Sequence, residues 1–553
     1  MKQTILGIVL IASAAWALGD QPSFEAADVH VSAKATNPMN QGARSSPIRD
    51  GRYEIKTATM VDLIRYAYGF ENDKILEGPN WLELDRFDVT AKVPDDTTPD
   101  NRKLMLQSLL SERFRLVVKK DTRPLPTYAL VAGKKPQMKE AGGTEENGCK
   151  PQSGGGGGEG GGRIMMSSNG GPPITFTLGP GMTIGYQCRN VTMAEFASNL
   201  RSMIGASLGT TAVVDDTGLK GKWSFDLRYS IAFFGPMPNG GDRISLNDAV
   251  EKQLGLKLEE RQIPTEVLVV QSVNRTPAPN PPGTAEALPP IPVPTEFEVA
   301  SVKPSDPGRM GGRYQMQPGG RLTAEGMNLR FLLSRAFNTN NSEEVVGLPD
   351  SIANERYDIT AKTSSGGASV GSMDNEVLSP MMLNLLKDRF KLTYHTEDRP
   401  VTAYSLAAAK PKMKKADPNS RIYCHNTNPP PGAPPGSRLL KCQNITMAMF
   451  AERLRNATPD LNWPVQDATG LEGSWDFTLM FSMRPMMAMG MPMGGGRGGP
   501  GGEGGVVPQA SEPVEGLSIF EAMEKQLGLK LEKQKRNEKV FVIDNIAARP
   551  VEN

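Results

Sequence analysis

The chain has 553 residues, which is too long for one ordinary domain. Its 62 Lys and Arg residues nearly balance 61 Asp and Glu residues, so the overall charge excludes a general attraction to nucleic acid or to an anionic membrane. Apolar residues make up 38% of the chain and Gly (58) and Pro (45) are abundant, so we expect compact cores separated by solvated linkers.

The N-terminus has the pattern of a signal peptide. Lys2 precedes the apolar run "ILGIVLIASAAWA", and Ala15 and Ala17 give the small residues that favour cleavage after Ala17. The run is short for a membrane span, and an uncleaved anchor is the alternative. No later stretch is apolar enough to cross a bilayer. We therefore expect residues 1–17 to be removed and the mature protein to be periplasmic or secreted.

The mature sequence is a tandem duplication. The nonamer "EKQLGLKLE" occurs at Glu251–Glu259 and again at Glu524–Glu532. Further matches pair "DRFDVTAKV" with "ERYDITAKT", "CRNVTMAEFASNL" with "CQNITMAMFAERL" and "TGLKGKWSFDL" with "TGLEGSWDFTL". The copies span residues 22–274 and 296–547. The proline-rich segment 275–295 between them is predicted to be an extended spacer, disordered over 276–295.

Each copy contains a weaker inner repeat, in which helix, strand, helix, strand and strand follow one another twice. We therefore predict an α+β fold with four units near residues 24–140, 185–274, 297–415 and 440–547. In each unit, two helices with one apolar face each would cover a small mixed sheet. The last two strand segments of each unit, such as "RLVV" and "TYALV", are expected to form an antiparallel hairpin whose outer edge could accept a partner strand.

Helix boundaries follow from spacing and caps. Apolar residues at i, i+3, i+4, i+7 and i+8 predict helices that begin after Thr59 and Asn328. Gly255 and Gly528 stand where a left-handed helix cap is expected. Capping boxes are predicted at Thr192–Glu195 and Ser518–Glu521. The apolar faces consist of Met60, Leu63, Ile64, Ala67 and Tyr68 in copy 1, and of Leu329, Leu332, Leu333, Ala336 and Phe337 in copy 2.

The four cysteines predict one disulfide in each copy. In an exported protein, Cys149 would pair with Cys188 and Cys424 with Cys442. A zinc site is the alternative, but no C-x-x-C occurs and only His425 stands beside a cysteine.

Two motifs invite a chemical interpretation. "VVDDTGLKG" contains Asp-Thr-Gly, which is typical of aspartic proteases, but Ala468 stands opposite Asp216 in the second copy. The recurring aspartates, Asp215 and Asp467, instead suit a turn. The methionine-rich tract Met483–Gly496 offers soft thioether ligands for Cu(I), although a flexible loop is the simpler interpretation. Its candidate ligands are Met483, Met486, Met487, Met489, Met491 and Met493.

Other reactive patterns are missing from the sequence. The glycine-rich tract 153–171 lacks the G-K-[ST] of a phosphate loop, and it and residues 494–505 are expected to be disordered. Only three histidines occur, His30, His395 and His425, and no serine or cysteine stands in a G-x-S-x-G turn. We therefore predict no catalytic residues and no cofactor.

The repeated motifs "FEVASVKP", "DRFDVTAK" and "QLGLKLE…VFVIDNIAARP" resemble an uncharacterised exported family that is expanded in soil Acidobacteria and is called a domain of unknown function. Copy 2 lacks the tryptophan of "GPNWLELDRFD". The element order is also similar to the short N-terminal domain of secretins and TonB-dependent transporters, small periplasmic modules that bind other proteins. The resemblances imply export and a binding role.

The sequence as a whole predicts an exported, non-catalytic interaction protein whose partner is another exported or envelope protein. Two linked copies would raise avidity if both engaged one target. The alternatives are a hydrolase with a site assembled from scattered residues, and a periplasmic copper binder.

Overall fold

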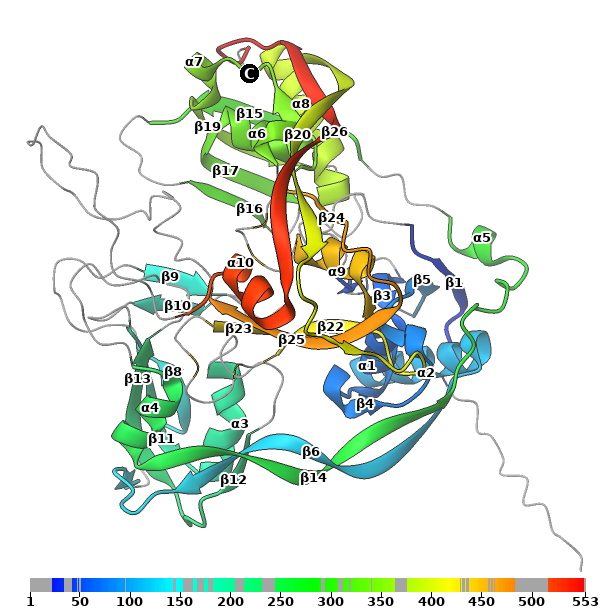
Figure 1. Cartoon of the computed structure of the whole chain (residues 1–553). Coiled ribbons are helices and arrows are strands. Elements are labelled where there is room, and N and C mark those ends of the chain that lie inside the picture. Colours follow the sequence, from blue (N-terminus) through cyan, green and yellow to red (C-terminus); the bar gives the residue numbers. More distant parts are fainter. Residues whose placement is uncertain are drawn as a thin grey trace, which may run out of the picture.

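Each copy forms two small α+β units that are joined by a long two-stranded ribbon (Figure 1). The α+β class and the duplication predicted from the sequence are both confirmed. The computed structural model describes residues 22–33, 42–46, 48, 51–94, 96–142, 146–152, 163–166, 174–177, 183–203, 213–230, 244–289, 294–306, 312–317, 320–339, 341–363, 375–427, 429, 433, 437–455, 458, 461, 463–482 and 516–551. The predicted signal peptide lies outside these residues.

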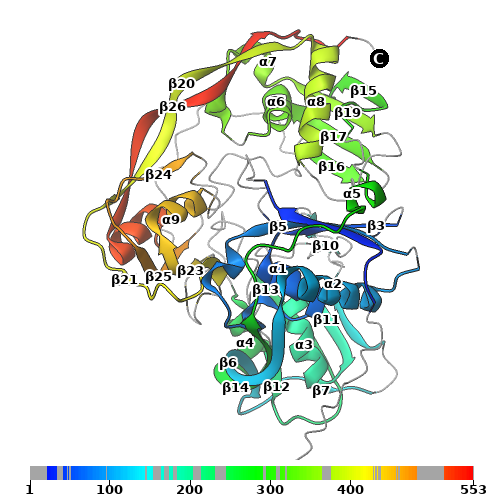
Figure 2. The same cartoon turned by 90° about the vertical axis from the view of Figure 1, so that its right-hand side faces the viewer.

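The first unit of copy 1 is an antiparallel sheet with the strand order β1-β5-β3-β2. Helices α1 and α2 lie on one side of it (Figure 2), and their apolar faces share one core with the inner face of the sheet. The elements are β1 (Ala26–Val31), β2 (Arg44–Ser45), β3 (Arg52–Thr59), α1 (Met60–Tyr68), η2 (Asn72–Lys74), β4 (Ile75–Leu76), η3 (Asn80–Glu83), β5 (Arg86–Lys92) and α2 (Pro99–Phe114).

The second unit of copy 1 repeats this plan with the strand order β7-β13-β11-β8. Its core joins the sheet to α3 and α4. The elements are β7 (Lys139–Glu140), β8 (Gly148–Pro151), β11 (Thr183–Val191), α3 (Met193–Met203), β12 (Val213–Asp216), β13 (Trp223–Ser230) and α4 (Leu246–Leu254). A separate two-stranded sheet consists of β9 (Arg163–Met166) and β10 (Ile174–Thr177), so part of the tract 153–171 is ordered and the prediction of disorder is wrong there.

Copy 2 repeats both units, with sheets ordered β15-β19-β17-β16 and β21-β25-β23-β22. Its first unit contains β15 (Val299–Pro304), β16 (Arg313–Gln317), β17 (Arg321–Asn328), α6 (Leu329–Ala336), η5 (Ser342–Glu344), β18 (Val345–Val346), α7 (Asp350–Ala353), β19 (Arg356–Lys362) and α8 (Asn375–Phe390). Its second unit contains β21 (Lys414–Lys415), β22 (Tyr423–Thr427), β23 (Ser437–Thr446), α9 (Met447–Leu454), β24 (Val465–Asp467), β25 (Ser474–Ser482), α10 (Ile519–Ala522) and the π-helical turn η7 (Met523–Leu527).

The expected hairpins are absent from the described residues, and this prediction is wrong. "RLVV" and "TYALV" belong to one continuous strand, β6 (Val117–Ala132), which pairs antiparallel along its length with β14 (Leu256–Ser272). Strands β20 (Thr393–Ala408) and β26 (Leu529–Asn545) form the same ribbon in copy 2. Pro124 and Pro126 are compatible with the continuous strand because each keeps the residue before it extended. Each ribbon therefore connects its two units instead of closing within one.

A short parallel strand at each end turns each ribbon into a four-stranded mixed sheet. In copy 1, β4 runs parallel to the end of β14, and β12 runs parallel to the end of β6. In copy 2, β18 and β24 pair in the same way with β26 and β20. Each unit thus contributes one strand to the ribbon that joins it to its neighbour.

A recurring bulge supports the inner repeat. The third strand of every unit has a β-bulge at a residue with positive φ, and two residues later a capping residue begins the helix. In chain order, the bulge residue and the capping residue of the four units are Thr57 and Thr59, Asn190 and Thr192, Gly326 and Asn328, and Asn444 and Thr446. The predicted caps at Thr59 and Asn328 and both predicted capping boxes are confirmed.

The repeated nonamer is confirmed as a helix end that leads into a strand. Gly255 and Gly528 both have a φ of 66° and cap α4 and η7. A Cβ at Gly528 would overlap the carbonyl oxygen of Lys410, and one at Gly255 would overlap that of Lys135. Glycine is therefore needed at both places for conformation and for space.

The spacer between the copies is ordered over its described part, which contradicts the expected disorder. Its chain folds back on the first unit, where the Asn274 amide donates to the Phe114 carbonyl (2.7 Å) and the Ala278 amide to that of Arg113 (2.7 Å). It then forms α5 (Thr284–Ala287). The tract 494–505 lies outside the described residues.

Candidate functional site

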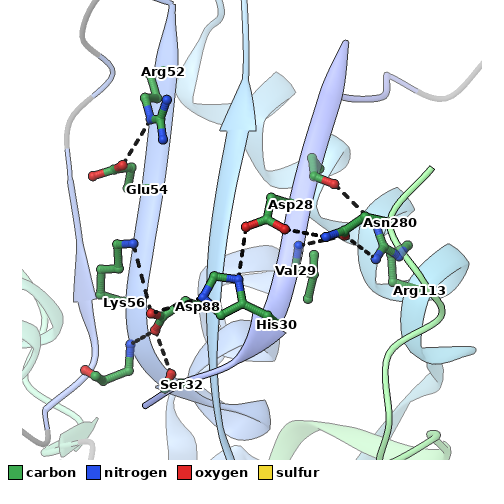
Figure 3. A network of polar contacts seen from close by, with 12 residues as sticks. Asp28, Val29, His30, Ser32, Arg52, Glu54, Lys56, Asp88, Arg113 and Asn280 are labelled. Atoms are coloured by element: carbon green, nitrogen blue, oxygen red, sulfur yellow. Dashed lines mark hydrogen bonds and ion pairs between the residues drawn. The ribbon is translucent and has the colours of Figure 1, made fainter. Parts of the chain in front are cut away.

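An exposed polar cluster lies on the face of the first sheet that points away from α1 and α2 (Figure 3). His30 Nδ1 lies 2.9 Å from Asp28 Oδ2, and His30 Nε2 lies 3.7 Å from Asp88 Oδ2. Lys56 Nζ lies 4.0 Å from the same Asp88 oxygen. The His30 side chain is 51% exposed and that of Asp88 is 16% exposed, so the imidazole can be reached from solvent.

Within this cluster, Asp88 stabilises the bulge of β3. Its Oδ1 accepts hydrogen bonds from the Thr57 amide (2.8 Å) and the Ser32 hydroxyl (2.6 Å). The bulge amide therefore has a charged acceptor, although it has left the strand ladder. The same amide is bound by an equivalent side chain in the other units, in the pairs Asp358 with Gly326, Asp476 with Asn444 and Ser224 with Asn190.

The histidine itself is not part of the repeated scaffold. Lys303 stands at the place of His30 in copy 2, and Ser301 stands at the place of Asp28. An aspartate beside a histidine can orient the ring, but the neighbouring Ser32 hydroxyl donates to Asp88 and not to the histidine. Among the described residues, no group of three or more His, Cys, Asp or Glu side chains is arranged to hold a metal ion.

The spacer completes the other side of this region. Arg113 in α2 is 2% exposed, and its guanidinium donates to the carbonyl oxygens of Ala278 and Ala27 and to Asn280 Oδ1. Burial lowers the pKa of Arg113 below its ordinary value, and the nearby Glu112 and Asp28 carboxylates offset only part of this shift. Asn280 Oδ1 also accepts from the Val29 amide (3.0 Å). We call the contacts of Arg113 and Asn280 with β1 the spacer latch.

A small hollow of about 200 Å³ lies beside the spacer latch, between β1, α2 and the spacer. Its lining mixes apolar side chains such as Phe24, Met105 and Leu109 with Glu112. The lining includes no His or Cys that could act as a nucleophile or soft ligand.

The Asp-Thr-Gly segment is a local turn. Asp215 Oδ1 accepts from the Thr217 amide (2.9 Å) and hydroxyl (2.7 Å), and Gly218 has a φ of 67°. Asp467 and Thr469 repeat this geometry at the same distances in copy 2. Asp216 is exposed and pairs with Arg261. The turn interpretation from the sequence therefore agrees with the structure.

Cysteines pair as the sequence predicts. Cys149 is bonded to Cys188 and Cys424 to Cys442, and each disulfide joins directly opposed residues of neighbouring strands. The six methionines proposed as Cu(I) ligands lie outside the described residues.

Two buried tyrosines also have raised pKa values. Burial raises the pKa of Tyr186 to about 12, and burial raises that of Tyr229 as well. Both phenols therefore stay protonated at neutral pH. Leu440 and Phe481 replace them in copy 2, which indicates that these positions fill the core.

The two copies meet at a polar contact. Arg421, before β22, donates to the Ile75 carbonyl (2.7 Å) and lies 3.5 Å from Glu83. Their side chains are only 13% and 10% exposed, and burial lowers the pKa of Arg421 while Glu83 raises it. His425 contacts the other Glu83 oxygen, and the Ile422 amide donates to the Asn80 carbonyl (3.0 Å). We call this set the copy contact.

Sequence reasoning missed the bulge acceptors, the spacer latch and the copy contact. The bulge acceptors had a signal, because an acidic residue follows the aromatic residue in "RFD", "RYD" and "SWD". Arg113 and Glu83 carried no such signal, since their partners lie far away in the sequence.

The model of a family described as a protein of unknown function (DUF3738) matches residues 61–273 and 330–546. The chain belongs to the DUF3738 family. The two matched regions confirm that this chain carries the domain twice, as its internal repeat indicates. No curated protein and no solved structure matches the chain, so the similarity to secretin and transporter domains stays a prediction. Among the described residues, no helix of this DUF3738 protein has the length and apolarity to cross a membrane.

Proposed function

We propose that this DUF3738 protein is an exported, non-catalytic binding protein that presents two different surfaces on one repeated scaffold. The observation that carries the proposal is where the copies agree and where they differ. Residues that hold the fold recur in place, among them the turn aspartates, the helix caps and the glycines of the nonamer. The aspartates and caps bond backbone groups and the glycines end helices, so these residues support structure.

The exposed middle of the ribbons differs in charge. On β14, Glu260, Gln262, Pro264 and Glu266 lie on one face, and the matching residues of β26 are Lys533, Lys535, Asn537 and Lys539. We call the second set the basic row and the first set the matching row. Both rows are exposed and lie outside the four cores, so the cores do not require the difference in charge. Different charge on a shared scaffold favours two distinct partners or two parts of one partner.

The test is cross-linking in the producing cells. A photo-reactive residue is placed at Gln262, at Lys535, or at the exposed Glu286 of α5 as a control. We expect protein adducts from the two ribbon positions, with different partners, and none from Glu286. Ribbon positions that give no more adduct than Glu286 would contradict the proposal.

A separate experiment tests the alternative that this chain is a hydrolase. The purified chain is assayed against chromogenic ester, glycoside and peptide substrates. Turnover that is lost in a His30→Ala or Asp28→Ala variant would make the polar cluster of Figure 3 an active site and overturn the binding proposal.

A further inference from the structure

We propose that the outer edge of β26, from Leu531 to Lys539, is a docking site where an extended acidic segment of a partner protein adds a strand to the ribbon. This inference deepens the proposed function and rests on it, since it names the chemistry of one partner. The argument depends on which backbone groups point outward, which of them are already bonded, and which charges surround them.

Contacts of β20 show which residues point outward. The Thr402 amide donates to Glu343 Oε2 (2.8 Å), and the Tyr404 amide donates to the Pro464 carbonyl (2.7 Å). Both bonds leave the ribbon, so these residues occupy non-hydrogen-bonded pairs of the ladder. Lys535 and Lys533 stand opposite them on β26. In such pairs the amide and carbonyl of both residues face away from the partner strand.

The same alternation continues along β26 to Asn537 and Lys539, because the ladder has no irregularity there. Among the described strands, only β18 pairs with this outer edge, and it does so farther along, at Phe541 and Val542. Within the described part of the chain, the outward groups of the basic row therefore form an open strand edge. Nine residues of strand span about 30 Å, which is enough for a specific extended segment.

Copy 1 shows what a closed edge looks like in the same register. Pro264 takes the place of Asn537 and stands opposite Pro124, while Pro126 stands opposite Gln262. Proline has no amide hydrogen to offer, and its ring hinders a further strand at that position. The ribbon of copy 1 is protected on both edges, whereas β26 has no proline in this stretch.

The charge of the open edge selects the partner. The basic row carries three lysines, and the Lys535 side chain stays 64% exposed while Nζ donates to Thr402 Oγ1 (2.9 Å) and lies 3.6 Å from Glu343. Lys533 Nζ lies 4.8 Å from the centre of the Trp463 ring, which packs on Tyr404 of the neighbouring β20. In the matching row, Glu260 and Glu266 would repel an acidic strand. An extended segment with acidic residues at every second position satisfies both the amides and the lysines of β26.

The test measures binding of a labelled nine-residue peptide, with glutamate at every second position and threonine between, to the full-length chain by fluorescence anisotropy. A peptide with lysine in place of glutamate is the charge control. We expect saturable binding of the acidic peptide that weakens at high salt, and weaker binding of the lysine peptide. A wild-type chain that binds neither peptide, or both equally, would overturn the inference.

Two variants separate strand addition from simple charge attraction. Asn537→Pro copies the closed edge of copy 1 and keeps every lysine, and we expect at least tenfold weaker binding. Lys533→Glu with Lys539→Glu keeps the open edge and copies the charges of copy 1, with a similar loss expected. Pro264→Asn in copy 1 is the matched control and should leave affinity unchanged. Unchanged thermal unfolding shows that each variant is folded, and the ribbon of copy 1 accepts proline in the same register.

An Asn537→Pro chain that binds as tightly as wild type would refute strand addition even if the lysine variants lose affinity. Partner adducts at Lys535 in cells that persist in Asn537→Pro would have the same meaning while leaving the proposed function intact. Failure of every ribbon position to give adducts would instead count against the proposed function.

Discussion

At the scale of single residues, the polar side chains of this protein hold backbone in place where strands bulge, turn or end. Asp88 binds the bulge amide of Thr57, and Asp215 closes the turn before β13. The equivalent residues of copy 2 do the same. Such positions recur because an unbonded backbone group away from water is costly, by roughly 1–3 kcal/mol.

The glycine that ends the repeated nonamer gives the first prediction. Gly528→Ala places a methyl group against the Lys410 carbonyl at a φ of 66°, so we expect a loss of at least about 2 kcal/mol in the stability of the last unit. Lys391 holds the same left-handed cap at the end of α8, with a φ of 52°. Lys391→Gly should change stability by less than about 1 kcal/mol. Urea unfolding of both variants measures the difference, and equal losses would contradict the steric argument.

The neighbouring aspartates of "VVDDTG" give the second prediction. Asp215→Ala removes two hydrogen bonds from the turn and should cost about 1–2 kcal/mol. Asp216→Ala removes only an exposed ion pair with Arg261 and should cost less than about 0.5 kcal/mol. Thermal unfolding midpoints measure both. Pepstatin-sensitive proteolysis by the purified chain that disappears in Asp216→Ala would overturn the turn interpretation.

At the scale of elements, the protein combines guarded and open strand edges. β1 is an edge strand of the first sheet, and the spacer latch bonds its outward groups at Ala27 and Val29. The ribbon of copy 1 is guarded by prolines instead. In contrast to these two guarded edges, the stretch of β26 from Leu531 to Lys539 is the edge where we propose that another chain adds.

The spacer latch gives the third prediction. Asn280→Ala leaves the Val29 amide without its acceptor and Arg113 with fewer partners, so the spacer should detach more often. We expect faster hydrogen exchange at Val29 and across residues 276–289, with the cores of the other units unaffected. Glu286→Ala on exposed α5 is the control and should exchange like wild type. Unaltered exchange at Val29 in Asn280→Ala would show that the latch contributes nothing.

At the scale of the whole molecule, the two copies are joined by a contact in which copy 1 supplies the carboxylate and copy 2 supplies the guanidinium. Glu83 is replaced by Ala353 in copy 2, and Arg421 corresponds to Glu146 in copy 1. The first unit of copy 1 can therefore form an ion pair with the second unit of copy 2, while the reverse pair would set Glu146 against Ala353 and cannot form one. The charges therefore favour this pairing of units over the reverse one.

The copy contact gives the fourth prediction. Arg421→Ala takes the guanidinium from the buried Glu83 carboxylate and leaves it only the His425 contact, which opposes closure of the interface. We expect the radius of gyration from small-angle X-ray scattering to increase while the unfolding midpoints of the units stay the same. Lys441→Ala, at an exposed position of β23, is the control. An Arg421→Ala chain with wild-type dimensions would show that the copies are held by other contacts.

The sequence by itself determined the parts that depend on local chemistry. Apolar spacing placed the faces of α1 and α6, capping residues placed the starts of the helices, and Gly255 and Gly528 placed two of their ends. The repeat gave the duplication, and the cysteine positions gave the disulfides. Each of these features is set by residues a few positions apart or by direct comparison of the two copies.

Only the tertiary structure decided how the strands pair, where the spacer lies and how the copies meet. A segment such as "RLVVKKDTRPLPTYAL" satisfies local rules both as a hairpin and as one long strand. The partner strand, more than a hundred residues away, decides between the hairpin and the long strand. Backbone hydrogen bonds form with the strand that the packed units bring alongside. The roles of Arg113, Glu83 and the open edge of β26 could not be predicted from the sequence for the same reason. Their bonding partners are distant in the chain and adjacent only in the fold.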